Sequence, residues 1–233
     1  MIANKMAAEH QPPGNQASIR TAEVELLGLV AYGSLAAFER TASAATEAPS
    51  IKDKLVLARI AAQRFSHLGR LERELQTRGS HLQGAMQRFM TPVDAFNGHT
   101  EPKTWAESLV KLCIIGGLVR DFADGVGGNL SAELREILTG SIDDAELASE
   151  PGRMLAEAIT ADPDQRGRLA LFGRRLLAEA LSQAQRVAAR EGELTTMLTG
   201  LGEGQGDDLA AISALMSRLA AAHGERMELL GLT

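Results

Sequence analysis

The sequence predicts an all-α protein with four long bundled helices, extra short helices and a fifth long helix near the C-terminal end. Hydrophobic residues make up 45% of the 233 residues but aromatic residues only 3%, a balance that favours helices over strands. Apolar residues recur at helical steps of three and four, and no segment of four to eight residues alternates like a strand. We therefore expect a flexible tail at residues 1–17 and one helical domain at residues 18–233.

The first half of the domain predicts two long helices. The first covers residues 18–45 and is apolar almost all round, which is typical of a helix buried on more than one side. The second covers residues 51–78 and ends at Gly79. A short helix at 82–90 and an irregular loop around Pro92 are expected to follow.

The second half predicts the remaining helices. Thr100 opens the third long helix, which fades in the glycine-rich residues 125–128. Short helices are expected at 130–139 and 153–160, the fourth bundle helix at 163–198 and a terminal amphipathic helix at 207–229.

Two pairs of polar residues interrupt the apolar stripes of the long helices. Arg64 and His67 lie three residues apart on the second helix, and Glu179 and Ser182 repeat this spacing late in the chain. Spacing i, i+3 places both side chains on one face of a helix. Carboxylate-bridged di-metal bundles use Glu-x-x-His pairs at this spacing. Here one pair lacks its glutamate and the other its histidine, so the pattern indicates a di-metal bundle whose metal site is largely removed.

The expected ligand set is too small for a di-metal centre. Only His67 and Glu179 stand at ligand positions, while Ser34 occupies the corresponding place on the first helix. Glu39 and Asp121 could contribute only through a shifted register. We therefore expect no metal and no other cofactor, and iron held by these four acidic and histidine residues is the alternative.

We expect a polar cluster in place of the metals. Its predicted members are Ser34, Arg64, His67, Glu179 and Ser182. The Arg64 guanidinium can form two parallel hydrogen bonds with the Glu179 carboxylate across the core. On this hypothesis Arg64→Met lowers stability, because it leaves a buried charge without its partner.

Five segments carry a resemblance to a known family. They are AYGSLAAFER at 31–40, AAQRFSHLGRL at 61–71, ESLVKLCIIGGLVRDF at 107–122, RLALFGRRLLAEALSQAQRVAA at 168–189 and RMELLGL at 226–232. Through them the chain resembles the ferritin-like fold proteins of actinobacteria, which are grouped with the bacterial ferritin-like tRNA hydroxylases. The resemblance implies a ferritin-like up-down-down-up four-helix bundle. In metal-binding relatives it implies carboxylates at the places of Ser34, Arg64 and Gly116, and this chain departs at all three.

Three functions stay open at this point. The first is a non-catalytic ferritin-like protein with a degenerate di-iron site and a structural or interaction role. The second is a metal-dependent, oxygen-activating hydroxylase of the tRNA-modifying type. The third is a bundle that binds a small apolar ligand in its vacated centre. The ligand count favours the first, and no catalytic residues are assigned.

The net charge and the apolar surface of the chain indicate which partners it can bind. The net charge of -6 disfavours broad nucleic-acid binding, and a tRNA surface would have to use Arg174, Arg175, Arg186 and Arg190. The N-terminal residues lack the apolar core of a signal peptide or anchor, so we expect a cytoplasmic protein without membrane contact. Surplus apolar surface on the first and terminal helices predicts a homodimer.

Overall fold

The computed structural model describes residues 13–139, 145–200 and 205–233, and the regular structure of these residues is helical throughout. The all-α prediction is therefore confirmed. The α-helices are α2 (Pro13–Glu47), α3 (Ile51–Thr77), α4 (Leu82–Gln87), α5 (Met90–His99), α6 (Trp105–Val126), α7 (Ala132–Thr139), α8 (Ala145–Ala161), α9 (Arg166–Arg190), α10 (Gly192–Thr199) and α11 (Gln205–Leu229). Residues 13–17, expected in the tail, belong to α2, and residues 1–12 lie outside the described part of the chain.

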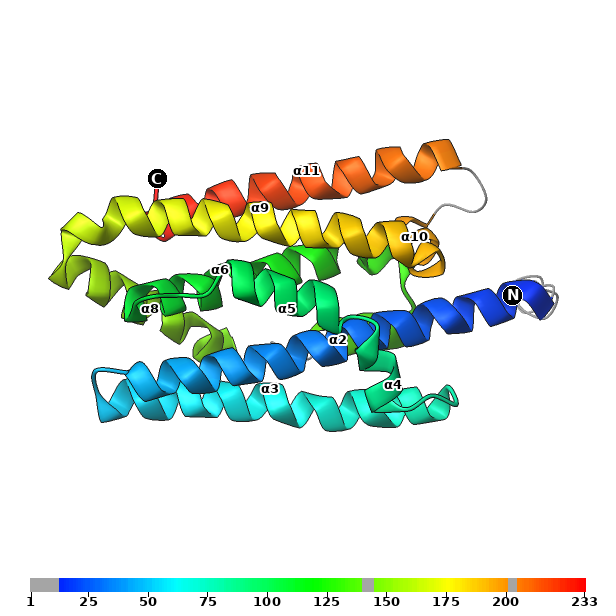
Figure 1. Cartoon of the computed structure of the whole chain (residues 1–233), viewed down its shortest axis with the longest axis horizontal. Coiled ribbons are helices and arrows are strands. Elements are labelled where there is room, and N and C mark those ends of the chain that lie inside the picture. The colour runs from blue at the N-terminus through cyan, green and yellow to red at the C-terminus, as the bar shows by residue number, and fades with distance from the viewer. Residues whose placement is uncertain (1–12, 140–144, 201–204) are drawn as a thin grey trace, which may run out of the picture.

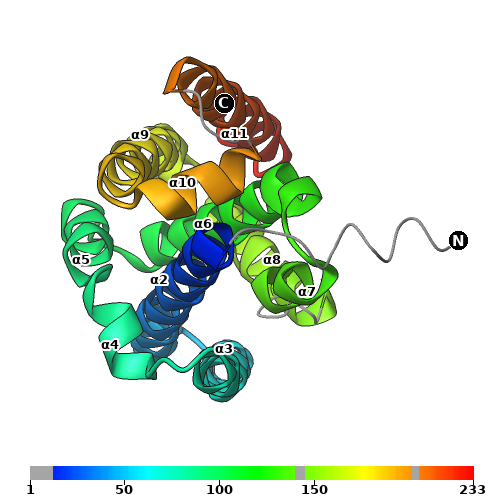
Figure 2. The same ribbon diagram turned by 90° about the vertical axis from the view of Figure 1, so that its right-hand side faces the viewer.

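The helices α2, α3, α6 and α8 surround one interior (Figure 2). α3 packs against α2 and α8, and α6 packs against the same two helices, so the four form a closed ring. In Figure 1, α2 and α8 run in one direction and α3 and α6 in the other. This is the up-down-down-up order that was expected.

The fourth helix of the ring is α8, whereas the sequence placed residues 163–198 there. Met154, Leu155 and Ile159 of α8 are buried in the core. The prediction failed at Pro151, which was taken as the end of a polar connection, because a proline usually ends or kinks a helix. α8 instead continues through Pro151, and α9 packs outside the ring against α5 and α6.

Two helices in the middle of the chain also differ from expectation. Residues 90–99 form α5 rather than an irregular loop, because Pro92 lies in the first turn, where its missing N–H leaves no helical bond unmade. α6 begins at Trp105, later than predicted. Its cap is Thr104, whose side chain accepts a hydrogen bond from the backbone N of Glu107.

The boundaries of α3 are close to those predicted. Ser50 caps its first turn by accepting a hydrogen bond of 3.1 Å from the backbone N of Asp53. Gly79 follows its end with a φ of 73°, a left-handed conformation that favours glycine. By contrast, the helix expected at 163–198 divides into α9 and α10 at Glu191.

Apolar side chains form two clusters along the ring. The first joins all four ring helices to α9 and α11 and includes Leu57, Leu109 and Leu155. The second joins α2, α3 and α6 to α4, α7 and α10 and includes Leu27 and Leu71. Each such leucine contributes about 1.5–3 kcal/mol by its burial, so these clusters supply most of the drive to fold.

The terminal helix α11 lies on α6 and α9, outside the ring (Figure 1). A Cβ atom at Gly117 of α6 would collide with the Arg226 side chain, and one at Gly173 of α9 with Met227. The Arg226 Nη2 also donates to the Asp121 carboxylate at 2.6 Å. Glycine at these two positions therefore leaves room for the ends of the Arg226 and Met227 side chains.

By length and composition alone, residues Gln16–Glu47 of α2 could cross a membrane. In the fold, Leu26, Leu27 and Ala31 of this stretch are buried in the second cluster. Burial of a core helix accounts for its apolar composition equally well.

Candidate functional site

Ser34, Arg64 and His67 lie midway along the α2–α3 hairpin, between residues of the two apolar clusters. The rings of Phe38 and Phe65, with centroids 5.2 Å apart, define the antiparallel register of the two helices. That register places Ser34 near the level of His67. Ser34 is 8% exposed and His67 1% exposed. Ser34 and His67, two of the five residues predicted for the polar cluster, therefore share one buried level of the hairpin, and Arg64 is half-buried one turn of α3 away.

Arg64 is half-buried. Its Nε is buried, and within the described residues this atom meets no hydrogen-bond acceptor and no carboxylate pairs with the guanidinium. Burial lowers the pKa of Arg64. A partly buried cation without an anion loses hydration that no carboxylate of the described residues replaces.

Glu179 lies elsewhere, and the predicted ion pair between Arg64 and Glu179 is wrong. α9 packs outside the ring, where the Glu179 Oε1 lies 2.8 Å from Nδ1 of His99 and accepts a 2.6 Å hydrogen bond from Nε2 of Gln183. These bonds, first that of Gln183 and then that of His99, lower the pKa of Glu179. Glu179 thus has its own partners at the α5–α9 contact.

The remaining predicted residues do not join the bundle centre either. Ser182 is half-buried on α9, outside the ring. Glu39 is exposed on α2, and the Asp121 carboxylate accepts the hydrogen bond from Arg226 of α11. A Cβ at Gly116 would meet no atom within 4 Å, so no neighbour requires glycine there.

The donors at the bundle centre do not fit a di-iron group. Di-iron sites need several carboxylates and two imidazoles, but the level of Ser34 and His67 supplies one hydroxyl, one imidazole and the Arg64 cation. Across residues 13–139, 145–200 and 205–233, three or more His, Cys, Asp or Glu side chains nowhere gather in a group able to hold a metal ion.

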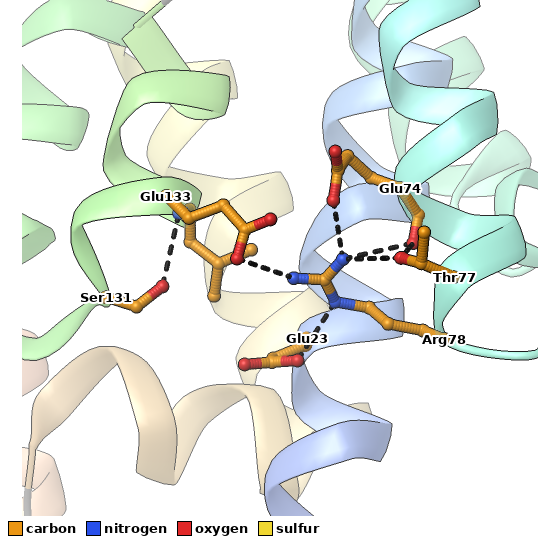
Figure 3. A network of polar contacts seen from close by, with 7 residues as sticks. Glu23, Glu74, Thr77, Arg78, Ser131 and Glu133 are labelled. Atoms are coloured by element: carbon orange, nitrogen blue, oxygen red, sulfur yellow. Dashed lines mark hydrogen bonds and ion pairs between the residues drawn. The ribbon is translucent and has the colours of Figure 1, made fainter.

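A network around Arg78 was not predicted (Figure 3). The Arg78 Nε donates to Glu23 of α2 at 3.0 Å, and its Nη1 donates to Glu74 of α3 at 2.8 Å. Its Nη2 lies 3.8 Å from Glu133 of α7. Hydrogen bonds with Glu74 and Glu23 outweigh burial and raise the pKa of Arg78. The network fastens α7 to the hairpin, a long-range contact that helical periodicity does not encode.

Lys111 of α6 is a further buried cation. Its Nζ donates to the backbone O of Thr100 at 3.1 Å and lies 5.1 Å from the centre of the Phe96 ring. Burial, with a smaller contribution from Arg40, lowers the pKa of Lys111 to about 8. A lysine on an otherwise apolar helix face was the available signal in the sequence.

Arg88, at the end of α4, joins two acidic residues from distant helices. Its Nη1 donates to the Glu25 carboxylate at 2.7 Å, and its Nη2 lies 3.5 Å from Glu191. Glu25 is 5% exposed, and burial, followed by the nearby Glu191 charge, raises its pKa. The sequence offered one sign of this cluster, a glutamate directly before Leu26 and Leu27.

The ring and its connections define the class of protein. An all-α up-down-down-up ring with a long connection between its second and third helices is the ferritin-like architecture. A family model described as the ferritin-like domain of actinomycetes matches residues 17–201. The chain belongs to this family. No curated protein matches it. The matched range ends before α11.

Proposed function

We propose that this protein is a non-catalytic ferritin-like protein with a structural or interaction role, and that its bundle centre is a polar core in place of a di-iron site. The observation that supports this most directly is that a half-buried cation, Arg64, lies one helical turn from the buried His67 on α3, where a di-iron site would need carboxylates. By resemblance, metal-binding relatives have carboxylates at the places of Ser34 and Arg64.

Electrostatics argues against a metal close to this arginine. A guanidinium about 5 Å from a divalent cation is repelled by about 7 kcal/mol at an effective dielectric constant of about 20. The carboxylates that would offset this repulsion are absent from the described residues around Arg64. Glu179, the best carboxylate candidate from the sequence, is occupied by His99 and Gln183.

Metal analysis of protein purified without chelator tests the proposal. We expect iron and manganese well below one ion per chain, and no iron retained after anaerobic loading with Fe(II) and gel filtration. The variant Ser34→Glu with Arg64→Glu supplies two carboxylates and serves as the comparison. Near-stoichiometric iron in the natural sequence, lost on changing His67 to Leu, would contradict the proposal.

The same assay addresses the alternative of an oxygen-activating tRNA hydroxylase, since that reaction requires a metal centre. Arg174, Arg175, Arg186 and Arg190, its predicted tRNA contacts, are exposed along α9. Tight iron binding together with salt-sensitive tRNA binding would favour this alternative. A small apolar ligand fits less well, because the centre presents the polar side chains of Arg64 and His67.

We further propose that the protein works in the cytoplasm as a homodimer. Exposed apolar side chains on α3 support the dimer, because Ile51, Leu55 and Phe65 are 73%, 52% and 55% exposed and lie on one side of the helix. Met227 and Leu232, in contrast, are buried within the chain. Sedimentation should show a dimer that Phe65→Glu dissociates, while Leu229→Glu, at an 88% exposed site on α11, leaves it intact. A monomer at micromolar concentration would contradict the dimer.

A further inference from the structure

His223 stands in the inward-facing stripe of α11, the helix that lies on α6 and α9 (Figure 1). Leu215, Leu219 and Met227 share this stripe with it at intervals of four residues, a spacing that keeps side chains on one side of a helix. Leu219 and Met227 belong to the first apolar cluster, and His223 is 4% exposed. A titratable side chain therefore occupies a position in the otherwise apolar face by which α11 docks.

The ring of His223 lacks hydrogen-bond partners in the docked helix. Both of its nitrogens are shielded from solvent, and neither has a partner among the described residues. The neutral ring already forgoes its hydrogen bonds, which is unfavourable. The protonated ring would carry two N–H donors and a charge into the same place, which costs far more. The docked position of α11 therefore accepts the neutral ring and disfavours the protonated one.

Two charged groups act on the ring. Arg226, one turn further along α11, disfavours a second positive charge, while Asp121 of α6 favours it. The Asp121 carboxylate already accepts a hydrogen bond of 2.6 Å from the Arg226 Nη2, so much of its charge is offset. No charged side chain from the described residues of α9 or α10, the other helices packed on α11, acts on the ring. Burial first, and the Arg226 charge second, lower the pKa of His223.

We propose that α11 is a proton-controlled covering helix, which docks on α6 and α9 while His223 is neutral and is released when this histidine takes up a proton. Histidine exposed to water has a pKa of about 6.5. Because the pKa is lower in the docked helix, the released helix binds more protons. The free energy that holds α11 in place is therefore fully present above about pH 6.5 and falls as the pH decreases below that value.

The release can be local, because the four ring helices pack against one another without α11. Leu219 and Met227 then leave the first apolar cluster, and the faces of α6 and α9 that they cover become accessible. The bundle centre lies inside the ring and α11 outside it, so this inference does not depend on the function proposed above.

Hydrogen exchange of the full chain, followed by mass spectrometry at pH 7.5 and pH 5.5, tests the proposal. After correction for the intrinsic pH dependence of exchange, we expect the opening equilibrium of residues 215–229 to rise several-fold at pH 5.5. The upper limit is about tenfold, for a docked helix that takes up no proton. Peptides from α3 and α8 should show a smaller rise. His223→Leu makes the stripe continuous and should abolish the rise at α11.

The matched control is His81→Leu, because His81 is exposed before α4 and its side chain makes no capping hydrogen bond. This variant should keep the acid-dependent rise at α11. An equal rise in His223→Leu would overturn the proposal. So would an opening equilibrium of α11 that does not change with pH, or an equal rise across the ring helices, which would mean that the whole fold opens at once.

Discussion

Arg64 of α3 and Arg78, which caps the end of α3, are both half-buried but have opposite surroundings. Arg78 has carboxylates from α2, α3 and α7 around it, and its pKa is raised. Arg64 meets no carboxylate within the described residues, and its pKa is lowered by burial. The comparison shows that burial alone does not define the role of a charge. Arg78 joins helices, whereas Arg64 is a cost to stability that the fold retains at the bundle centre.

Removing Arg78 should have the largest effect on stability. Arg78→Met leaves Glu23 and Glu74 without their cation, and we expect the free energy of unfolding to fall by about 3 kcal/mol, at the lower end for broken buried pairs because these carboxylates are partly exposed. Urea unfolding followed by circular dichroism measures the change. An unchanged midpoint would mean that the pairing of Arg78 with Glu23 and Glu74 does not stabilise the fold.

Lys111 adds to the comparison a buried cation whose ammonium group contacts the backbone carbonyl of Thr100 and the ring of Phe96. Its pKa of about 8 in the fold lies below the usual value of about 10.4. Between these two pH values the unfolded chain binds more protons, so stability rises with pH by about 3 kcal/mol. Unfolding curves from pH 7.5 to 10.5 should show the rise, and Lys111→Met should remove it. If the Lys111→Met variant shows the same rise of stability with pH, the rise comes from another titrating group.

Arg64→Met should act in the opposite direction from Arg78→Met. The sequence predicted a loss of stability, because Glu179 was expected to remain as a stranded partner. With Glu179 bonded to His99 and Gln183, the substitution removes a half-buried charge and leaves no carboxylate behind. We expect the free energy of unfolding to increase by about 1–2 kcal/mol. A decrease like that of Arg78→Met would remove the distinction between the two arginines.

The smallest effect is expected at the edge of the Arg78 network. The Glu133 side chain is 63% exposed and 3.8 Å from the guanidinium. Glu133→Gln should therefore lower stability by less than about 0.5 kcal/mol. Glu74→Gln, whose carboxylate is less exposed and bonded at 2.8 Å, is the matched comparison and should cost more. Equal losses of stability in the two variants would show that distance and exposure do not determine the strength of these two ion pairs.

Local signals in the sequence were sufficient for α3. Ser50 and Gly79 mark its ends, and the helical spacing places Arg64 and His67 on one side of α3, where His67 is buried and Arg64 half-buried. The fourth ring helix could not be found in this way, because Pro151 gives the same signal inside α8 as it would at a helix end. Because residues 163–198 were expected as the fourth ring helix, Glu179 was expected at the bundle centre. Periodicity identifies the buried face of a helix but not the helix that packs against it.

The docking of α11 has a consequence for the order of folding. Asp121 and Arg226 are 105 residues apart in the chain, and Leu109 of α6 shares a cluster with Met227 and Leu232. During synthesis α6 is therefore made long before the helix that covers its outer face. Contacts at such separation form late and slow folding, and the uncovered apolar surface invites association in the meantime. The nascent protein should thus depend on chaperones until α11 docks.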